Sequence, residues 1–211
     1  MAVLATDDFN RADKNTSDST ELDSASPVHD WTASGGFFKL LTNTARAANA
    51  GADAAEFNND VTWPDDQYAK ATLGTVSATG GLGSGYGVVV RAAAGTNAYR
   101  LVGNDNGWEL LRFVAGAGTA LSSNTSTVFA TGDTIELRCS GVGATVTFVA
   151  LKNDVEFSLG AGQTDTHADR RLSGNPGVGH SSTTDAADGV DSWEGGDLIL
   201  SSTTLWAQSV M

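Results

Sequence analysis

Short runs in which apolar and polar side chains alternate recur along most of the chain. In 134–139, for example, Ile135, Leu137 and Cys139 share one side of the run and polar residues occupy the other. A period of two is typical of a β-strand with one face toward a core, and glycines separate successive runs at short intervals from about residue 80 onward. The pattern predicts strands at 3–9, 37–42, 68–73, 87–93, 98–103, 108–114, 134–139, 145–151 and 192–201.

The turns between these strands favour antiparallel pairing. Asn104-Asp105-Asn106-Gly107 separates two apolar runs, and an Asn-Gly pair supplies the positive φ that a tight hairpin needs. The Gly141-Val142-Gly143 segment separates two further strands in the same way. We therefore expect a meander of antiparallel strands.

Two segments depart from this pattern. Residues 13–30 are rich in Asp, Ser and Thr, which predicts a loop. The alanine-rich segment 44–57 could start a short helix, but Asn49 and Gly51 interrupt it and it lacks an apolar stripe at helical spacing, so we interpret it as strand and loop. The predicted fold class is all-β, a two-sheet antiparallel sandwich with under about a tenth of its residues in α-helix.

The length of 211 residues fits one domain, and the sequence contains no internal repeat. We expect a single sandwich over residues 1–201 and a C-terminal tail over 202–211. The tail carries Leu205, Trp206 and Val210, and ordering it costs about 1–2 kcal/mol per residue unless burial offsets that cost. The tail is therefore expected to pack on a neighbouring subunit or another protein; the alternative is that it covers an edge strand of its own sandwich.

Charge and composition narrow the classes of partner. With 12 Lys and Arg against 25 Asp and Glu, the formal net charge is −13, which disfavours nucleic acid and anionic membranes. Apolar runs are too short for a membrane-spanning helix, and the N-terminus lacks the basic region of a secretory signal. The single Cys139 cannot form an internal disulfide and is interpreted as a core residue. We expect a protein made in the host cytoplasm.

Catalytic patterns were sought among the carboxylates and other titratable residues. Glycoside hydrolases need two carboxylates that flank one bond, whereas the Glu residues here are scattered and Glu109 and Glu136 look like solvent-facing strand residues. A lyase could instead use Arg91, Tyr99 and His180, should they converge. The alternative, that Tyr99 packs in the core and Arg91 pairs with a carboxylate, is the simpler interpretation. We expect no enzymatic activity.

Metal binding is considered for zinc and for calcium. His29, His167 and His180 are far apart in sequence and have no ligand-spaced partners, which argues against zinc. Calcium prefers hard oxygen ligands, and acidic residues cluster at both chain ends. The candidate calcium ligands are Asp7, Asp8, Asp191 and Glu194, with Asp185, Asp188 and Asp197 nearby in sequence. The alternative is a set of solvated acidic loops, with no cofactor at all.

Aromatic residues supply candidates for sugar binding, because an exposed ring can stack on a pyranose. Trp31 and Trp193 lie in strand-like contexts and are expected in the core. The remaining candidates for carbohydrate binding are Trp63, Trp108, Tyr99 and Arg91.

The order of these elements resembles the concanavalin A-like lectin/glucanase jelly rolls, in particular the laminin-G-like domains of bacterial and phage sequences. The resemblance rests on the passages 7–13, 66–73, 85–91 followed by 98–100, 174–179 and 190–194, and it spans most of residues 1–200. It concerns strands and turns, so it implies a jelly-roll fold more than an activity. It also implies that the first and last strands are neighbours, which would bring Phe9 close to Trp193.

These observations lead to a hypothesis with two alternatives. We expect a non-catalytic, lectin-like structural protein of a phage virion, on its surface or as a capsid decoration, that contacts other virion proteins or copies of itself. The first alternative is a carbohydrate-binding module or lectin, which an exposed aromatic row on the concave sheet would favour. The second is a polysaccharide-degrading enzyme, which a cleft with converging carboxylates would favour.

Overall fold

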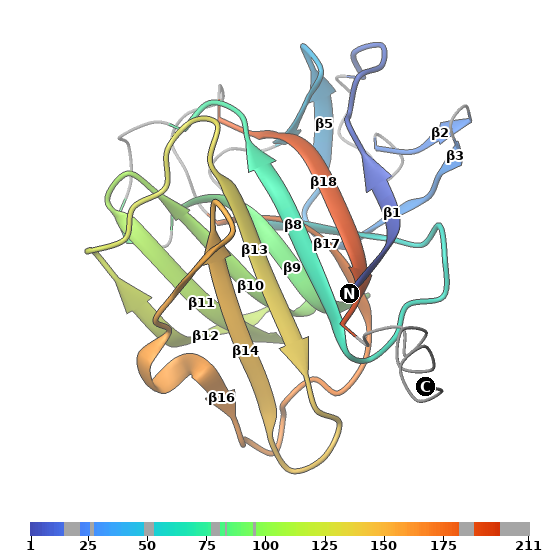
Figure 1. Ribbon diagram of the computed structural model, residues 1–211. Helices are drawn as coiled ribbons and strands as arrows, with labels where there is room; N and C mark the ends of the chain where they lie inside the picture. Colours follow the sequence, from blue (N-terminus) through green and yellow to red (C-terminus); the bar gives the residue numbers. More distant parts are fainter. Residues whose placement is uncertain are drawn as a thin grey trace, which may run out of the picture.

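The computed structural model describes residues 1–14, 22–25, 28–48, 53–76, 81–82, 84–94, 96–181 and 188–198. These residues form two large antiparallel sheets that pack face to face (Figure 1). A two-stranded ribbon of β2 (Ser24–Ala25) and β3 (Val28–His29) lies beside them, and the helical part of the described chain is one 3₁₀ turn, η1 (Gly160–Gln163). The predicted two-sheet jelly-roll sandwich is therefore confirmed.

The nine-stranded sheet has the strand order β15-β14-β13-β8-β18-β6-β5, and β1 and β16 add to it by pairing with β18 and β14. Its strands are β1 (Ala2–Asp7), β5 (Phe38–Leu41), β6 (Thr44–Ala47), β8 (Gln67–Leu73), β13 (Thr134–Ser140), β14 (Val146–Lys152), β15 (Val155–Phe157), β16 (Thr164–Asp165) and β18 (Val190–Asp197).

The seven-stranded sheet has the strand order β12-β11-β10-β9-β17-β7-β4. Its strands are β4 (Trp31–Gly35), β7 (Ala54–Asn58), β9 (Gly85–Ala93), β10 (Asn97–Asn104), β11 (Gly107–Val114), β12 (Ala117–Asn124) and β17 (Asn175–Ser181). The hairpin expected at Asn104–Gly107 joins β10 to β11, with Asn104 paired to Gly107. Asp105 and Asn106 therefore form the turn.

The first and last strands of the sandwich are neighbours, as the sequence resemblance implied. Asp7 of β1 pairs with Trp193 of β18, and Trp31 stands between Phe9 and Trp193, with ring centroids 5.9 and 5.0 Å from theirs. Phe9, Trp31 and Trp193 are all buried, which confirms the interpretation of both tryptophans as core residues. This aromatic group fixes β1 to the body of the molecule.

The core between the sheets is built from alternate residues of the strands. Ile135, Leu137 and Cys139 point into it as the sequence predicts. Burial raises the pKa of the Cys139 thiol to about 12, so the thiol stays neutral. One expectation for these strands was wrong: Glu136 is 4% exposed, because Arg138 Nε lies 2.5 Å from its carboxylate and covers it.

The seven-stranded sheet also buries its outer face. Val89 and Val102 point away from the core between the sheets, yet neither is accessible to solvent. In the strand order β17 and β7 separate β4 from β9, but Ser34 Oγ of β4 donates a 2.6 Å hydrogen bond to Ala93 O of β9. The edge of this sheet therefore curls over its own outer face.

Candidate functional site

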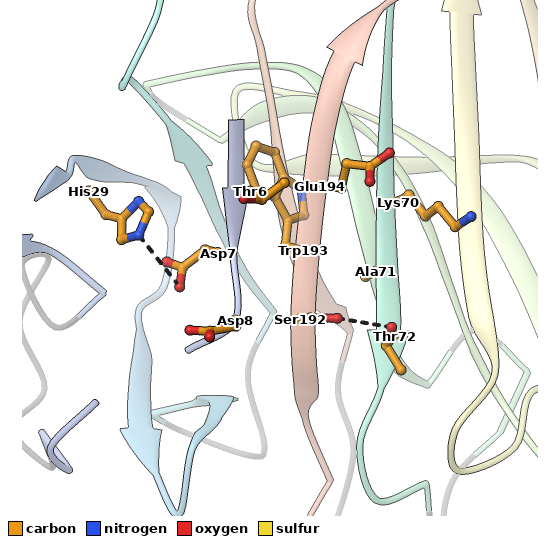
Figure 2. A pocket seen from close by; sticks show the side chains of 10 residues that line it. All are labelled: Thr6, Asp7, Asp8, His29, Lys70, Ala71, Thr72, Ser192, Trp193 and Glu194. Atoms are coloured by element: carbon orange, nitrogen blue, oxygen red, sulfur yellow. Dashed lines mark hydrogen bonds and ion pairs between the residues drawn. The ribbon is translucent and has the colours of Figure 1, made fainter. Parts of the chain in front are cut away.

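A pocket of about 480 Å³ lies where β1, β18 and β8 run side by side in the nine-stranded sheet (Figure 2). Most of its lining comes from these three strands, and His29 of β3 adds to it. Polar side chains predominate, so the pocket suits a ligand rich in hydrogen-bonding groups. The lining residues are Thr6, Asp7, Asp8, His29, Lys70, Ala71, Thr72, Ser192, Trp193 and Glu194.

Strand pairing places the side chains of this pocket. Thr6 pairs with Glu194, and Glu194 pairs with Lys70, so the three residues form one row across β1, β18 and β8. In a second row Ser192 pairs with Thr72, and Ser192 Oγ donates a 2.9 Å hydrogen bond to Thr72 Oγ1. Because the side chains stand on paired strands, their spacing is fixed by the sheet.

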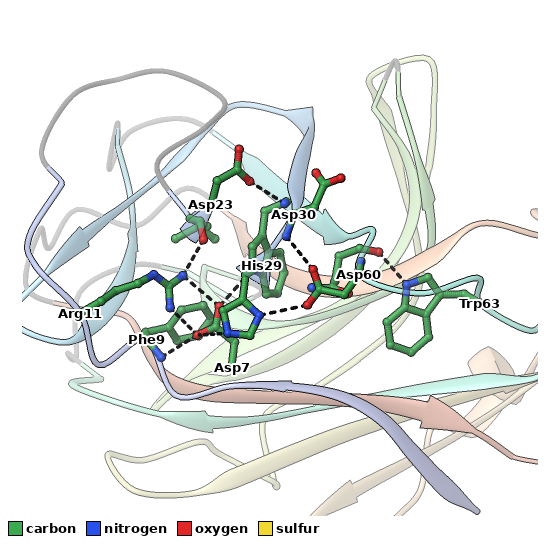
Figure 3. Close-up of polar contacts among 11 residues, drawn as sticks. Asp7, Phe9, Arg11, Asp23, His29, Asp30, Asp60 and Trp63 are labelled. Carbon is green, nitrogen blue, oxygen red and sulfur yellow. Dashed lines mark hydrogen bonds and ion pairs between the residues drawn. The ribbon is translucent and has the colours of Figure 1, made fainter. Parts of the chain in front are cut away.

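Asp7 is the buried carboxylate of the pocket. It accepts hydrogen bonds from Arg11 Nη1 and Nη2 at 2.6 and 2.9 Å, from Trp31 Nε1 at 3.0 Å and from the backbone N–H of Phe9 at 2.8 Å (Figure 3). A carboxylate has about four lone-pair positions, and these donors use them. Asp7 therefore holds the end of β1 against the core and has little capacity left for a ligand.

His29 joins β3 to the same polar group. Its Nδ1 lies 3.0 Å from Asp60 Oδ2, and its Nε2 lies 4.0 Å from Asp7 Oδ1. Asp60 is itself held by the backbone N–H of Asp30 at 2.6 Å (Figure 3). The imidazole is thus oriented by two carboxylates at the edge of the pocket.

Two other carboxylates of the pocket are less committed. Asp8 is exposed and accepts one hydrogen bond, from the backbone N–H of Asn10 at 3.0 Å. Glu194 Oε1 accepts a 2.7 Å hydrogen bond from Tyr68 Oη, and burial together with this bond raises the pKa of Tyr68. Within the described residues neither carboxylate has a cation within ion-pair distance.

The cation of the pocket is already paired. Lys70 Nζ lies 2.6 Å from Asp154 Oδ1, and that hydrogen bond raises the pKa of Lys70 above its usual value. Arg11, next to the pocket, is paired with Asp7. The carboxylates of the pocket that form no ion pair within the described residues are therefore Asp8 and Glu194.

The candidate calcium ligands are only partly brought together. Asp7, Asp8 and Glu194 line the pocket, whereas Asp191 lies outside its lining and accepts a 3.1 Å hydrogen bond from Thr44 Oγ1. The described residues contain no group of three or more His, Cys, Asp or Glu arranged to hold a metal ion. Since Asp7 is saturated by Arg11 and Trp31, this set does not fit calcium as a cluster.

The tryptophans considered as candidates for sugar stacking, Trp63 and Trp108, are buried in the interior. Trp63 is 9% exposed, donates from Nε1 to Asn58 O at 2.7 Å and packs edge-on against Trp193. Trp108 is 1% exposed and packs against Phe157. Both rings fill the core, where a pyranose cannot reach them.

Arg91, Tyr99 and His180 do not form a lyase site. All three are inaccessible to solvent, and each has a separate structural contact. Arg91 donates to the backbone oxygens of Asp65 and Arg171, Tyr99 Oη donates to Asp165 Oδ2, and the His180 ring packs on Tyr86. The interpretation of Tyr99 as a packed core residue is the correct one, and sugar contact by Arg91 or Tyr99 is not supported.

Several lining residues were not identified as site residues from the sequence. The residues concerned are Thr6, His29, Lys70, Thr72 and Ser192. Lys70 and Thr72 alternate with Ala69 and Ala71 in the sequence, but a polar side of a strand does not by itself predict a pocket. His29 had no sequence signal, because it comes from the loop-rich segment 13–30. The predicted partner contacts Leu205, Trp206 and Val210 lie outside the described residues.

Among the described residues, no helix is long and apolar enough to cross a membrane.

Comparison with known proteins identifies the fold but not a family. No protein-family model and no curated protein matches the chain. The exoplasmic/lumenal domain of VIP36 in its Ca²⁺/Man2-bound form is similar with a TM-score of 0.50 and 12% identity, over 88% of this chain and 88% of that chain. Its metal-free form gives a TM-score of 0.50 and 12% identity, over 85% and 90% of the two chains. An endo-1,3-beta-glucanase from Streptomyces sioyaensis gives 0.46 and 12%, over 92% and 95%.

At these identities the similarity to VIP36 concerns the fold alone. The chain has the concanavalin A-like jelly-roll β-sandwich that the sequence resemblance implied.

Proposed function

We propose that this protein is a non-catalytic, lectin-like protein that binds a glycan in the pocket between β1, β8 and β18. The observation that carries the proposal is the lining itself, in which hydroxyl and carboxylate groups stand on paired strands around about 480 Å³. Fixed polar groups of this kind match the many hydroxyls of a sugar. The VIP36 domain, which has the same fold, is known with Ca²⁺ and Man2 bound.

The chemistry of the pocket favours binding over hydrolysis. A glycosidase needs one carboxyl that donates a proton and a second that attacks or activates water. Asp8 and Glu194 are the pair available here, but Glu194 Oε1 already accepts a 2.7 Å hydrogen bond from Tyr68 Oη, and Asp8 is exposed at the end of β1. Ser192 Oγ donates to Thr72 and not to a base, so it is not activated as a nucleophile.

A glycan-binding assay on a pocket-filling variant tests this proposal. Thr6 is exposed on β1 and lines the pocket, so Thr6→Trp should occupy it without disturbing the core. We expect wild-type protein to retain glycans on an array and Thr6→Trp to lose them at an unchanged Tm. Thr119→Trp, on the exposed strand β12, is the matched control and should bind as wild type. Binding that survives Thr6→Trp would place the ligand elsewhere.

The location of the protein is proposed from its sequence. The phage-type laminin-G-like pattern and the net charge of −13 support a module on the surface of a phage virion, as a structural or decoration protein. Mass spectrometry of purified particles should then detect the chain at the copy number of a structural protein. Deleting residues 202–211, which carry Leu205, Trp206 and Val210, should release it from the particles at an unchanged Tm. Its absence from repeated particle preparations would contradict the proposal.

A further inference from the structure

The strand β1 is an open, apolar edge of the nine-stranded sheet (Figure 1). Among the described residues it pairs with β18 alone, so the backbone groups on its other side can accept a further strand. A bulge between Val3 and Ala5 also leaves Leu4 without a partner in β18. Met1, Val3 and Leu4 are 51%, 54% and 39% exposed, and residues 1–6 carry no charged side chain. An edge of this kind suits strand addition.

The other edges of the two sheets are less suited to a new strand. At β5 the place is taken by Lys14, whose backbone N–H donates to Leu40 O at 3.0 Å. The strand β4 is folded toward β9, where Ser34 Oγ donates to Ala93 O. The strands β15 and β16 have three and two residues, and β12 consists mostly of small and polar residues. Within the described chain, β1 is therefore the edge with both free backbone groups and large exposed apolar side chains.

The segment that follows β18 matches this edge in composition. Residues 198–211 carry no charged side chain and include Leu205, Trp206 and Val210. With a net charge of −13, copies of the chain repel one another over most of their surface, so contact is favoured where both sides are uncharged. Burial of these apolar side chains against β1 would offset the entropy lost on ordering the segment.

The direction of the strands favours a segment from a second copy over the segment of the same chain. The strand β18 ends beside the first residues of β1, since Asp197 pairs with Ala2. A segment that turned back along its own β1 would run parallel to it, and parallel pairs are slightly less stable than antiparallel ones. The backbone N–H of Leu198 donates to Asp66 O at 3.1 Å, which directs the chain to the β8 side of β18, away from β1. A segment from another copy has neither constraint.

We infer that residues 202–211 of one copy add as a strand to β1 of a second copy. The acceptor strand and the start of the donor segment lie side by side in each copy, so one two-fold contact satisfies both and gives a closed dimer. The apolar side chains of the segment then cover those of β1. The inference names the occupant of this edge as the protein itself, and it does not depend on the glycan-binding function.

Analytical ultracentrifugation of the full chain over a concentration series tests this inference. We expect a monomer–dimer equilibrium that strengthens as salt is raised, because the contact is uncharged and salt screens the repulsion between acidic copies. Trp206→Ala, in the donor segment, should raise the dimer dissociation constant at least about tenfold, as loss of an aromatic anchor does. Gln208→Ala, in the same segment, is the matched control and should change it little. Association that weakens with salt would contradict the inference.

Variants of β1 test the acceptor. The double variant Val3→Lys, Leu4→Lys should be monomeric at an unchanged Tm, because both side chains are exposed and lysines on an edge strand oppose strand addition. Val155→Lys, at a 69% exposed position of β15, is the matched control and should dimerise as wild type. The double variant retains the donor, and a protein that lacks residues 202–211 retains the acceptor. Mixing the two should therefore give a heterodimer, although each alone is monomeric.

The remaining outcomes would overturn the inference. Dimerisation that persists without residues 202–211 would locate the contact elsewhere, and failure of the two complementary variants to form a heterodimer would exclude β1 as the acceptor. A full chain that stays monomeric would also be decisive. A lower Tm on deletion of residues 202–211 would then show that the segment packs on its own sandwich. Glycan binding is measured separately and is unaffected by any of these results.

Discussion

Asp165 shows how a single buried carboxylate can organise the side of the sandwich away from the pocket. It is 4% exposed and accepts hydrogen bonds from Tyr99 Oη at 2.8 Å, from Arg112 Nη1 at 2.9 and 3.0 Å and from the backbone N–H of His167 at 3.0 Å. Burial alone would raise the pKa of Asp165, but these bonds and the charge of Arg112 outweigh it and hold the pKa below its usual value. Tyr99, which was a candidate for sugar contact, instead links β10 to Asp165 in the interior.

This network predicts a pH dependence of stability. Because the pKa of Asp165 is lower in the folded state, its stabilisation is fully present above the unfolded value near pH 4 and is lost as the pH falls through the folded pKa. Asp165→Asn leaves Arg112 buried without its partner and should cost about 3–5 kcal/mol at pH 7. Thermal melts from pH 7 to pH 2.5 should show a smaller acid-induced loss in the variant. An equal loss in both proteins would contradict this.

The sequence predicted which face of a strand a residue occupies better than it predicted the role of the side chain. Alternation correctly assigned Ile135 and Leu137 to the core, because a period of two follows from strand geometry. It could not show that Trp63 and Trp108 are buried, since each stands beside a turn and its exposure depends on distant residues. For Trp63 the deciding neighbour is Trp193, on a strand far along the chain.

Among the elements, β-hairpins with strong turn signals were predicted and strands without alternation were not. The strand β12 consists of small and polar residues with an exposed side chain at most positions, so it shows no hydrophobic period. The strand β17 contains Pro176 and two glycines, which normally argue against a strand. A Cβ at Gly177 would lie 2.0 Å from Glu56 O of β7, so this glycine is required for close approach of the two strands. Such a strand can be recognised only from the strands with which it pairs in the structure.

The curl of the seven-stranded sheet depends on strand pairing, which, like β12 and β17, could not be predicted from the sequence. It buries Arg100 on the outer face, where the guanidinium lies 4.1 Å from the centroid of the Phe113 ring and burial lowers the pKa of Arg100 to about 10. Within the described part of the chain, an outer face closed in this way offers no exposed aromatic row for a sugar. The candidate glycan site is consequently on the nine-stranded sheet. Its acidic residues were visible in the sequence, but nothing there indicated that they share a pocket.

At the scale of the whole molecule, the arrangement predicts binding of polysaccharides without cleavage. Cleavage needs a proton donor and a second carboxylate on either side of one bond. The pocket of about 480 Å³ has room for a short glycan, and Oε1 of its Glu194 already accepts a hydrogen bond from Tyr68 Oη. We expect laminarin, agar, alginate and chitosan to keep their length after prolonged incubation, measured by size-exclusion chromatography and reducing-end release, with an active endoglucanase as positive control. Cleavage that disappears in Glu194→Gln or Asp8→Asn, but not in Asp105→Asn, would make the protein an enzyme.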